Sequence, residues 1–523
     1  MRGGIRRRPF EAMLALALLL AAPHLIAQSP PAAPTFRVDR FEVDGDNPLS
    51  AERTNAVLGD YVGAQSGVDG LLAAADALEA ELRDRGFSFY RVILPPQTLE
   101  GGTVRLEVKA FELSSVTVRG NEHFSQENVL ASVPSLRTGA VPSTRALYRD
   151  LDLANANPSK QIAVRFRESD TVPETLEADV QVEDRLPYSA FATLNNTGTA
   201  STGPLRMGIG AQATNLFDRD HTLLVNYVTS PGHAAQVKQA AVAYRIPLYG
   251  HGGSISAYYV RSDVDTGTVL NTFDVSGRGR FAGISYEHVL PRWNGVHHRV
   301  TVALDDKLFD NQIVAFGANL GVDARSRPVT LGYSGEYAGD GWSTTFRASY
   351  SRNTMSGGGN KGAAYRANRA GADTHWDVFR GGLTFDVLLP AEWALRAIFD
   401  GQLANEELIP GEQFGLGGAS SVRGFDERQI SGDDGVRGSF ELWAPPPAGT
   451  DLRFLFFVDT GSVKLKRPNP GITSRDALAS TGVGVRWQYK DRVAVSLDVG
   501  KVLEGTARRD EDARGHLNVL VRY

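Results

Sequence analysis

An arginine and a phenylalanine lie among glycines in SVRGF, residues 421–425, within the Gly-rich run 411–435. Glycine favours turns and close backbone approach, so this run is unsuited to a helix or a strand interior. A guanidinium that leaves water needs acceptors, and a carboxylate is its best bidentate partner. Asp459 is a carboxylate in an unusual place, because it interrupts the apolar strand-like stretch LRFLFFVDTGSV, residues 452–463. The chemistry that these residues offer is ion pairing, and the fold decides with which partner.

The sequence contains none of the catalytic or phosphate-binding spacings that we sought. Gly500-Lys501 is followed by Val502 where a phosphate loop has Ser or Thr, and neither G-x-S-x-G nor H-E-x-x-H occurs. His297 and His298 are adjacent, so in a strand they face opposite sides and are poorly placed to bind one metal. The chain has no cysteine, which excludes disulfides and cysteine nucleophiles. We predict no enzyme activity, no catalytic residue, no metal site and no cofactor.

The N-terminal residues predict a secretory signal peptide over residues 1–27. Four arginines precede an apolar run from Met13 to Ala22, and Ala27 ends a cleavage site. The apolar run is shorter than the roughly 20 residues that a spanning helix needs. An uncleaved membrane anchor is the alternative, and a Pro-rich linker follows over residues 28–35.

Composition excludes two further classes of protein. No other segment approaches the 18 consecutive apolar residues of a transmembrane helix, and the mean hydropathy is slightly negative. The net charge of -5 provides no basic field for nucleic acid. A membrane barrel stays possible, and 523 residues suggest more than one domain.

Two segments repeat one order of elements. FEVDGD at residues 41–46 and VTVRGN at residues 116–121 are both strand-like and closed by a glycine turn. Ser50 and Ser125 can each cap a helix, a second helix with one apolar face follows, and two alternating strands complete each unit. The apolar positions of the second helices are Leu71, Ala75, Leu78 and Leu82, and Leu147, Leu151 and Ala154. Both units are predicted to be β-α-α-β-β, with two unrelated α+β domains as the alternative.

From Tyr188 to Tyr523 the helical spacing disappears, and alternating stretches such as residues 342–350 and 493–499 recur. The region holds 336 residues (523 minus 187), too many for one soluble sandwich core. At roughly 20 residues per strand and connection it contains about 16 strands, an even number typical of outer-membrane barrels. We predict an all-β 16-stranded transmembrane barrel preceded by two small α+β domains.

The connections between these strands are of two kinds. Tight turns such as FDRDH, residues 217–221, alternate with long connections such as residues 353–373. Short turns at one rim and long loops at the other are typical of membrane barrels. The Gly-rich run becomes the sixth surface-side loop, long enough to fold into a wide lumen. The predicted domains are 36–111 and 112–186 for the two small units and 187–523 for the barrel, with an inward-folding loop over 404–435.

With these features in place, residues 36–523 resemble the two-partner secretion transporters, the haemolysin-activator branch of the superfamily that includes the barrel-assembly machinery. In that family two periplasmic POTRA domains precede a 16-strand barrel, and PPQTLEGGTVRLEV, residues 95–108, resembles the end of a first POTRA domain. SVRGF at 421–425 and FVDTG at 457–461 match the family's VRGF loop tip and its F-x-D-x-G strand motif. Their occurrence in this order makes the resemblance specific.

The resemblance implies a loop-to-wall clamp between Arg423 and Asp459. Phe425 would wedge against the wall, while Gly424 and Gly461 would allow the close approach. The clamp either gates the pore or only stabilises the barrel. The loop tip also contains Val422, and the strand motif contains Phe457.

The resemblance also implies export, without ATP, of one large unfolded exoprotein resembling a haemolysin or an adhesin. The POTRA domains would capture it by adding a strand to a sheet edge at FSFYRVIL, residues 87–94. The candidate substrate-binding residues are Phe87, Phe89, Tyr90, Val92 and Ile93, which otherwise form only the domain core. The chain is expected to be a monomer in the outer membrane, with the POTRA domains in the periplasm. Its other expected partners are outer-membrane lipids and the barrel-assembly machinery, and nucleic acid is not among them.

Two other functions remain open, namely a factor that inserts other barrels and a passive pore for small solutes. Family members often carry an N-terminal helix that plugs the pore. About eight residues separate the expected cleavage site from the first strand, too few at roughly 1.5 Å per residue to cross a barrel about 30 Å tall. We therefore predict no plug and expect the inward loop to be the main obstruction.

Overall fold

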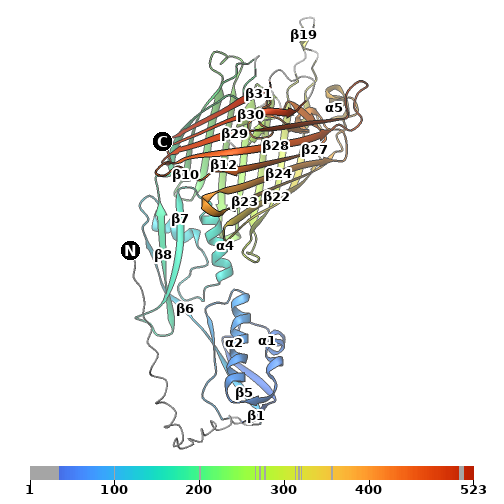
Figure 1. Cartoon of the computed structure of the whole chain (residues 1–523). Coiled ribbons are helices and arrows are strands. Elements are labelled where there is room, and N and C mark those ends of the chain that lie inside the picture. The colour runs from blue at the N-terminus through green and yellow to red at the C-terminus, as the bar shows by residue number, and fades with distance from the viewer. Residues whose placement is uncertain are drawn as a thin grey trace, which may run out of the picture. The chain divides into compact units, whose positions relative to one another are not determined.

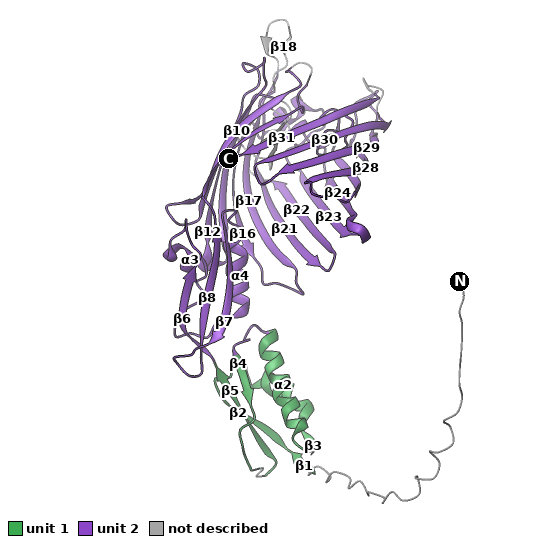
Figure 2. Cartoon of the chain, turned by 60° about the vertical axis from the view of Figure 1, so that its left-hand side comes forward, with its two compact units in different colours: residues 1–84, 90–110 green, residues 85–89, 111–523 purple. Residues whose placement is uncertain are grey.

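The fold is that of a computed structural model, which describes residues 35–98, 101–199, 202–264, 267–269, 273–275, 278–311, 314–315, 318–319, 321–354, 357–505 and 512–523. The predicted signal peptide, the linker up to residue 34 and the predicted absence of a plug lie outside these residues. Within the described part of the chain, no helix is both long and apolar enough to cross a membrane. Two compact units are present, the first comprising residues up to 84 with 90–110 and the second comprising 85–89 with 111–523 (Figure 2).

The first unit is a small α+β domain. Its sheet has the order β2-β5-β4, in which β2 and β5 are parallel and β4 and β5 antiparallel. The Ser50 hydroxyl accepts the N–H of Arg53 at 3.3 Å, so the predicted helix cap is present. The elements are β1 Thr35–Val38, β2 Arg40–Gly45, α1 Ala51–Leu58, η1 Gly59–Tyr61, β3 Gly63–Ser66, α2 Asp69–Asp84, β4 Tyr90–Ile93 and β5 Thr103–Ala110.

Two features of this domain differ from the sequence expectations. The strand expected over residues 87–94 is shorter, because only Tyr90–Ile93 pairs with β5. The ring of Phe89 instead lies 4.5 Å from that of Phe166, within the second unit. An additional two-stranded sheet, β1 with β3, was not predicted, since GAQS has no apolar alternation.

The second unit begins with a small domain of the same kind, the second small domain. Its sheet has the order β6-β8-β7, and the Ser125 hydroxyl accepts the N–H of Asn128 at 3.0 Å, as the sequence predicts. Leu147, Ile162 and Val180 are buried in one core between helices and sheet. The elements are β6 Glu112–Arg119, α3 Gln126–Ser132, α4 Thr144–Ala154, β7 Lys160–Glu168 and β8 Thr175–Asp184.

The rest of the second unit is a closed antiparallel barrel of 16 strands (Figure 1). The eighth strand carries two labels, β20 and β21, because it is interrupted at Arg327. The strands are β9 Tyr188–Asn195, β10 Arg206–Leu216, β11 His221–Thr229, β12 Gln239–Leu248, β13 Gly253–Ser262, β16 Gly279–Val289, β17 His297–Phe309, β20 Ala324–Ser326 with β21 Pro328–Gly339, β22 Trp342–Asn353, β23 Asp377–Leu388, β24 Ala394–Ala404, β27 Asp434–Trp443, β28 Leu452–Lys464, β29 Arg475–Tyr489, β30 Val493–Glu504 and β31 Ala513–Arg522.

Alternation along the strands sorts the side chains between two faces. In β28, Phe454, Phe456 and Val458 are exposed on the outer face, whereas Phe457 and Asp459 are buried on the lumen side. This is the pattern of a wall with lipid outside and polar groups inside. The barrel closes where β31 meets β9, over the pairs from Asn518–Asn195 to Arg522–Phe191, and Ala190 and Tyr523 exchange two further backbone hydrogen bonds.

Short elements lie between the strands. They are η2 Tyr249–His251, β14 Gly267–Val269 paired with β15 Phe273–Val275, β18 Val314–Ala315 paired with β19 Ala318–Asn319, α5 Gly362–Asn368 and η3 Pro390–Glu392. The connection between β22 and β23 folds over the barrel mouth on the loop side, where Tyr365 and Trp376 are fully buried with Phe281 and Phe309 of the wall.

A buried ion pair docks the second small domain on the short-turn rim of the barrel. The Lys160 ammonium on β7 lies 2.5 Å from the carboxylate of Asp220, in the turn between β10 and β11. The two side chains are 0% and 1% exposed. Tyr249 donates to the same carboxylate from the turn between β12 and β13, and Asn157 donates to it at 3.1 Å. A buried charge needs such a set of partners.

A third turn of the same rim also contacts the domain. Arg292, between β16 and β17, donates to Asp152 of α4 at 3.2 Å, and its guanidinium lies 4.6 Å from the ring centre of Tyr148. The second small domain is therefore attached to consecutive turns on one side of the barrel.

Candidate functional site

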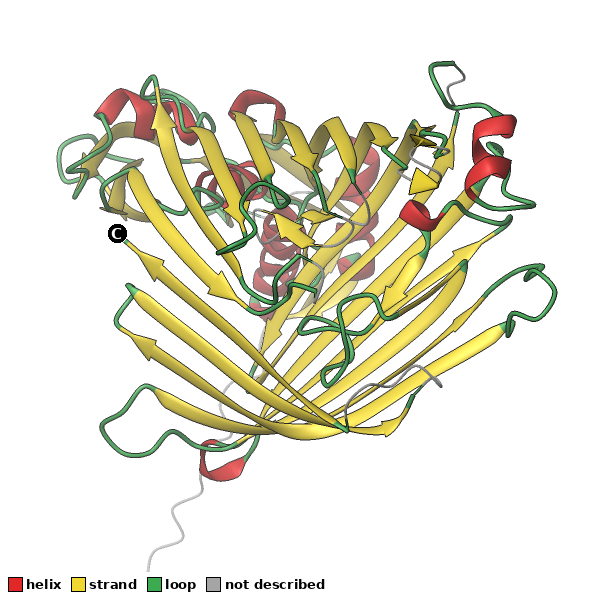
Figure 3. Ribbon diagram, turned by 90° about the horizontal axis from the view of Figure 1, so that it is seen from above, coloured by secondary structure: helices red, strands yellow, loops and turns green. Residues whose placement is uncertain are grey.

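The inward loop joins β24 to β27 and folds into the ring of strands (Figure 3). A one-turn helix, η4 Pro410–Glu412, opens it, and a short hairpin of β25 Phe414–Leu416 with β26 Ile430–Gly432 forms its stem. The residues between these strands form the tip, which holds SVRGF. Its many glycines permit this compact path, since Gly417, Gly418 and Gly424 all have positive φ.

Arg423 lies at the centre of the tip and is bound to the wall strand β28. Its Nε and Nη2 atoms donate to Asp459 Oδ2 and Oδ1, each at 2.8 Å, and its backbone N–H donates to Oδ2 at 3.1 Å. Arg423 is 4% exposed and Asp459 is fully buried. The guanidinium also lies 3.6 Å from the centre of the Phe457 ring, a cation–π geometry. One strand motif thus supplies both the counter-charge and the aromatic face.

Two further carboxylates face the same guanidinium. Arg423 Nη1 lies 2.8 Å from Glu441 on β27 and 3.6 Å from Asp498 on β30. Asp498 also receives two hydrogen bonds of 2.9 Å from Arg486 on β29. The site therefore holds three carboxylates against two arginines, and Arg423 is its central cation.

A histidine on the last strand completes the polar contacts of the tip. The N–H of Gly424 donates to Nε2 of His516 on β31 at 2.9 Å. His516 is 3% exposed, and this nitrogen has to be unprotonated to accept. The tip thereby contacts the strand that closes the barrel against β9.

Phe425 holds the apolar side of the tip. It is 3% exposed and packs in a cluster with wall residues Val463 of β28, Leu478 of β29 and Val502 of β30. Gly424 has a φ of +93°, and a Cβ there would lie 3.0 Å from the carbonyl oxygen of Gly500. The backbones of tip and wall therefore meet at two glycines.

Two more buried carboxylates hold the base of the loop. Glu412 accepts from Lys307 at 3.1 Å and from Ser326 at 2.7 Å, both on strands far from the tip. Asp433 pairs with Arg369 of the connection after β22 and accepts the N–H of Leu408 at 2.9 Å. The loop is thus attached at its base as well as at its tip.

At the other candidate site, the proposed sheet edge of the first domain is small. β4 lies at the edge of its sheet, but the N–H of Val92 donates to the Glu79 carboxylate at 3.3 Å, which covers part of that edge. Tyr90 is half-buried and Ile93 is 38% exposed. Phe87 and Phe89 precede the strand and lie in the second compact unit.

Sequence reasoning missed four residues of the tip site. Glu441, Asp498 and His516 fall on the lumen side by strand alternation, but alternation does not say at which height of the barrel each lies. Gly500 has no local signal besides Gly500-Lys501, which does not continue as a phosphate-binding loop. Its neighbour in space, Gly424, comes from a separate loop, which no local pattern could reveal.

Comparison with known proteins identifies the family to which this chain is similar. The haemolysin secretion/activation protein ShlB/FhaC/HecB family matches residues 177–487, and the ShlB-type POTRA domain matches residues 36–109. A heme/hemopexin transporter protein, HuxB of Haemophilus influenzae, is 22% identical over 489 residues, covering 89% of this chain and 83% of its own. The outer membrane transporter CdiB of Dickeya dadantii is 23% identical, covering 87% and 81%.

Solved structures show the same fold. CdiB from Escherichia coli superposes with a TM-score of 0.79 at 18% identity, over 97% of this chain and 93% of that one. BamA from Haemophilus ducreyi, without its POTRA domains 1–3, reaches 0.52 at 15% identity, over 93% and 100%. The chain therefore belongs to the haemolysin secretion/activation protein family and is a two-partner secretion transporter of the outer membrane, with its POTRA domains in the periplasm.

Proposed function

We propose that this transporter exports one large secreted protein as an unfolded chain through the barrel lumen, without nucleotide hydrolysis. One observation carries the proposal, namely that a loop tip held by the ion pair between Arg423 and Asp459 lies inside the lumen. Such a loop is displaced by breaking noncovalent contacts, so a passing chain can move it aside. Folding of the partner outside the cell makes the passage directional.

The first POTRA domain recognises the partner in the periplasm. Strand addition at β4 is the mode that we propose, with Tyr90, Val92 and Ile93 at the edge. The carboxylate of Glu79 then has to leave the N–H of Val92, because an added strand needs the same donor. Glu79→Ala is therefore expected to strengthen binding of the partner, whereas Val92→Pro is expected to abolish it.

The ion pair at the tip acts as a gate in this proposal. Removing Arg423 leaves Asp459 buried without its cation, which costs about 3–5 kcal/mol and favours conformations with the tip displaced. Without the tip in place, the wall loses the surface that positions a chain in transit. We expect Arg423→Ala to lower export and to raise the ion conductance of the barrel.

The test compares proteins of the culture medium from cells with the intact gene, with a deletion, and with Arg423→Ala. Equal amounts of the variant and intact barrels must reach the outer membrane. Arg299→Ala is the matched control, because Arg299 is also a lumen arginine by strand alternation, and its neighbouring carboxylates Glu287 and Glu336 lie on β16 and β21, away from the tip. Loss of one large protein in the deletion and in Arg423→Ala, with Arg299→Ala unchanged, supports export through a gated lumen.

The same experiment weighs the other functions. An assembly factor would leave the medium unchanged and deplete other outer-membrane barrels in the deletion. A passive pore would change only the uptake of small solutes. Either result would overturn the export proposal.

A further inference from the structure

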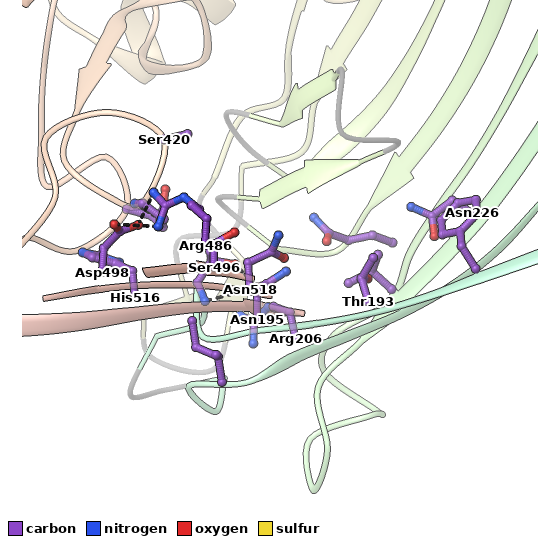
Figure 4. Close-up of a pocket in the computed structure, with 17 residues that line it drawn as sticks. Thr193, Asn195, Arg206, Asn226, Ser420, Arg486, Ser496, Asp498, His516 and Asn518 are labelled. Atoms are coloured by element: carbon purple, nitrogen blue, oxygen red, sulfur yellow. Dashed lines mark hydrogen bonds and ion pairs between the residues drawn. The ribbon is translucent and has the colours of Figure 1, made fainter. Parts of the chain in front are cut away.

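A polar cavity of about 300 Å³ lies beside the loop tip, along the lumen face of the strands that close the barrel. Its lining includes one row of neighbours on five adjacent strands: Arg486, Ser496, Asn518, Asn195 and Arg206. Figure 4 shows these side chains together, with Thr193 and Asn226 further along the wall. Ala419 and Ser420 of the tip border the cavity from the opposite side.

The charged groups of this lining already have partners. Arg486 pairs with Asp498, and Arg206 donates to the carbonyl of Gly203 at 2.8 Å. Glu427 accepts the N–H of Ala419 at 2.8 Å. Besides these partnered groups, the cavity offers a ligand chiefly side-chain amides and hydroxyls.

One of these amides lacks a partner. The Oδ1 atom of Asn226 on β11 is shielded from solvent and accepts no hydrogen bond. A buried acceptor left in this state is costly, so turning the Asn226 amide toward a ligand N–H would relieve that cost. Asn518 is exposed to the lumen and presents a second amide nearby.

The barrel already uses a side-chain amide to bind an extended backbone at this place. The Asn196 amide donates to the carbonyl of Gly515 and accepts the N–H of Leu517, both at 2.8 Å. Residues 515 and 517 lie on β31, so one asparagine spans two positions of an extended strand. An asparagine carries the same donor and acceptor groups as a peptide bond.

From these contacts we propose that the cavity binds the main chain of an extended polypeptide segment, and that Asn226 and Asn518 make the hydrogen bonds. Because every residue type has the same backbone, such a site accepts any sequence, as an exporter of a long chain needs. The site deepens the proposed export function and rests on it, since it places the path of the chain between the loop tip and strands β9 to β11.

The test is a footprint on the purified full chain in detergent. The protein has no cysteine, so Ser496→Cys and Thr345→Cys each introduce the only thiol. Ser496 lines the cavity as the neighbour of Asn518 on β30, whereas Thr345 lies on β22, outside the cavity. The probe is a synthetic peptide of repeated Gly-Ser-Asn, which is uncharged and unfolded. Polyethylene glycol of equal size is the control, because it has no N–H group.

We expect the peptide to slow thiol modification of Ser496→Cys about tenfold or more at saturation, with Thr345→Cys changed by less than about twofold and polyethylene glycol without effect. Adding Asn226→Leu should raise the half-protecting peptide concentration by about threefold to tenfold, the value of one hydrogen bond. If Asn226→Leu fails to insert, Thr193→Val at the same wall replaces it, with Thr345→Val as its match.

Three results would overturn the proposal. No protection at Ser496→Cys means that the cavity holds water only. Equal protection at both thiols, or equal protection by polyethylene glycol, means general blockage of the lumen. No shift with Asn226→Leu means that its amide does not bind the peptide. The footprint needs no secretion, so it can fail while the export test succeeds, and the reverse also holds.

Discussion

Lys160→Met tests whether the second POTRA domain is fastened to the barrel by its buried ion pair. The Lys160 ammonium contacts Asp220 at 2.5 Å and donates to Asn128 at 2.8 Å, and both charged side chains are almost fully buried. Burial lowers the pKa of Lys160, and the nearby carboxylate of Asp220 opposes this shift. Removing one partner of a buried pair costs about 3–5 kcal/mol.

The structure indicates the lower end of this range. In Lys160→Met the Asp220 carboxylate keeps three neutral donors, the amides of Asn157 and Asn128 and the hydroxyl of Tyr249. We therefore expect Lys160→Met to destabilise the docked domain by about 3 kcal/mol relative to the undocked domain. At 1.36 kcal/mol for each factor of ten, opening becomes about 150-fold more frequent.

Hydrogen exchange measures this opening directly. The amide of Ser125, whose N–H donates to Asp218 of the same barrel turn, should exchange up to about 150-fold faster where exchange follows the opening equilibrium, while amides of β28 stay unchanged as an internal reference. Asp220→Asn alone should behave like Lys160→Met, because it leaves the ammonium unpaired. The double variant should recover most of the loss, since neither charge then remains. Unchanged exchange at Ser125, or a double variant as poor as the sum of the two singles, would refute the reasoning.

Three further predictions concern the tip and the second POTRA domain. Asp459→Asn keeps the size of the side chain but removes the charge that faces Arg423, so planar-bilayer recordings should show more frequent openings than the wild type and fewer than Arg423→Ala. Gly424→Ala should also raise the opening frequency, because Gly424 has a φ of +93° and the new Cβ would lie 3.0 Å from the Gly500 carbonyl oxygen. Unchanged recordings would show that the tip tolerates this contact. Burial alone would raise the pKa of Asp184, but hydrogen bonds from the backbone and ring of His123 and from the backbone of Phe124 hold it below its ordinary value. The ionised Asp184 carboxylate therefore stabilises the domain above about pH 4, and this stabilisation is lost as the pH falls through the lowered pKa of the folded state. Hydrogen exchange at Phe124, followed through an acid titration, should show this pH dependence in the wild type and lose it in Asp184→Asn.

The sequence was sufficient for the fold because its signals are local and repeated. Strand alternation and turn residues recur around the whole barrel, and two serine caps mark equivalent helices in both small domains. The edge strand of the first domain was overestimated for the same reason. Phe87 and Phe89 continue the local alternation, but the ring of Phe89 packs on Phe166 of the following domain.

Only part of the tip site could be predicted from the sequence. SVRGF and FVDTG could be matched as motifs, whereas Glu441, Asp498 and His516 carry no local signal that distinguishes them from other lumen-facing residues. Their common position depends on the register of five strands and on the path of one loop. These are long-range features, which single-sequence patterns do not encode.

The two anchored parts of the second unit lie on different sectors of the barrel, and this limits which movements can accompany transport. The POTRA domain is fastened to turns that join β10 to β11, β12 to β13 and β16 to β17. The loop tip is fastened to β27, β28, β30 and β31. The two sets of contacts share no residue. The tip can therefore separate from the carboxylates that bind Arg423 without weakening the ion pair of Lys160 with Asp220.

The strands between the two sectors include β9, which closes the barrel against β31. The amide-lined cavity lies along these strands, and its lining also includes Asp498 and His516, which contact the tip. In the proposed mechanism a chain in transit is accommodated by a displacement of the tip away from β9 to β11, with the domain contacts intact. In this arrangement Lys160→Met should loosen the domain without raising ion conductance, whereas Arg423→Ala should raise conductance without changing exchange at Ser125. A variant pair in which both readouts change together would show that the two anchors are coupled after all.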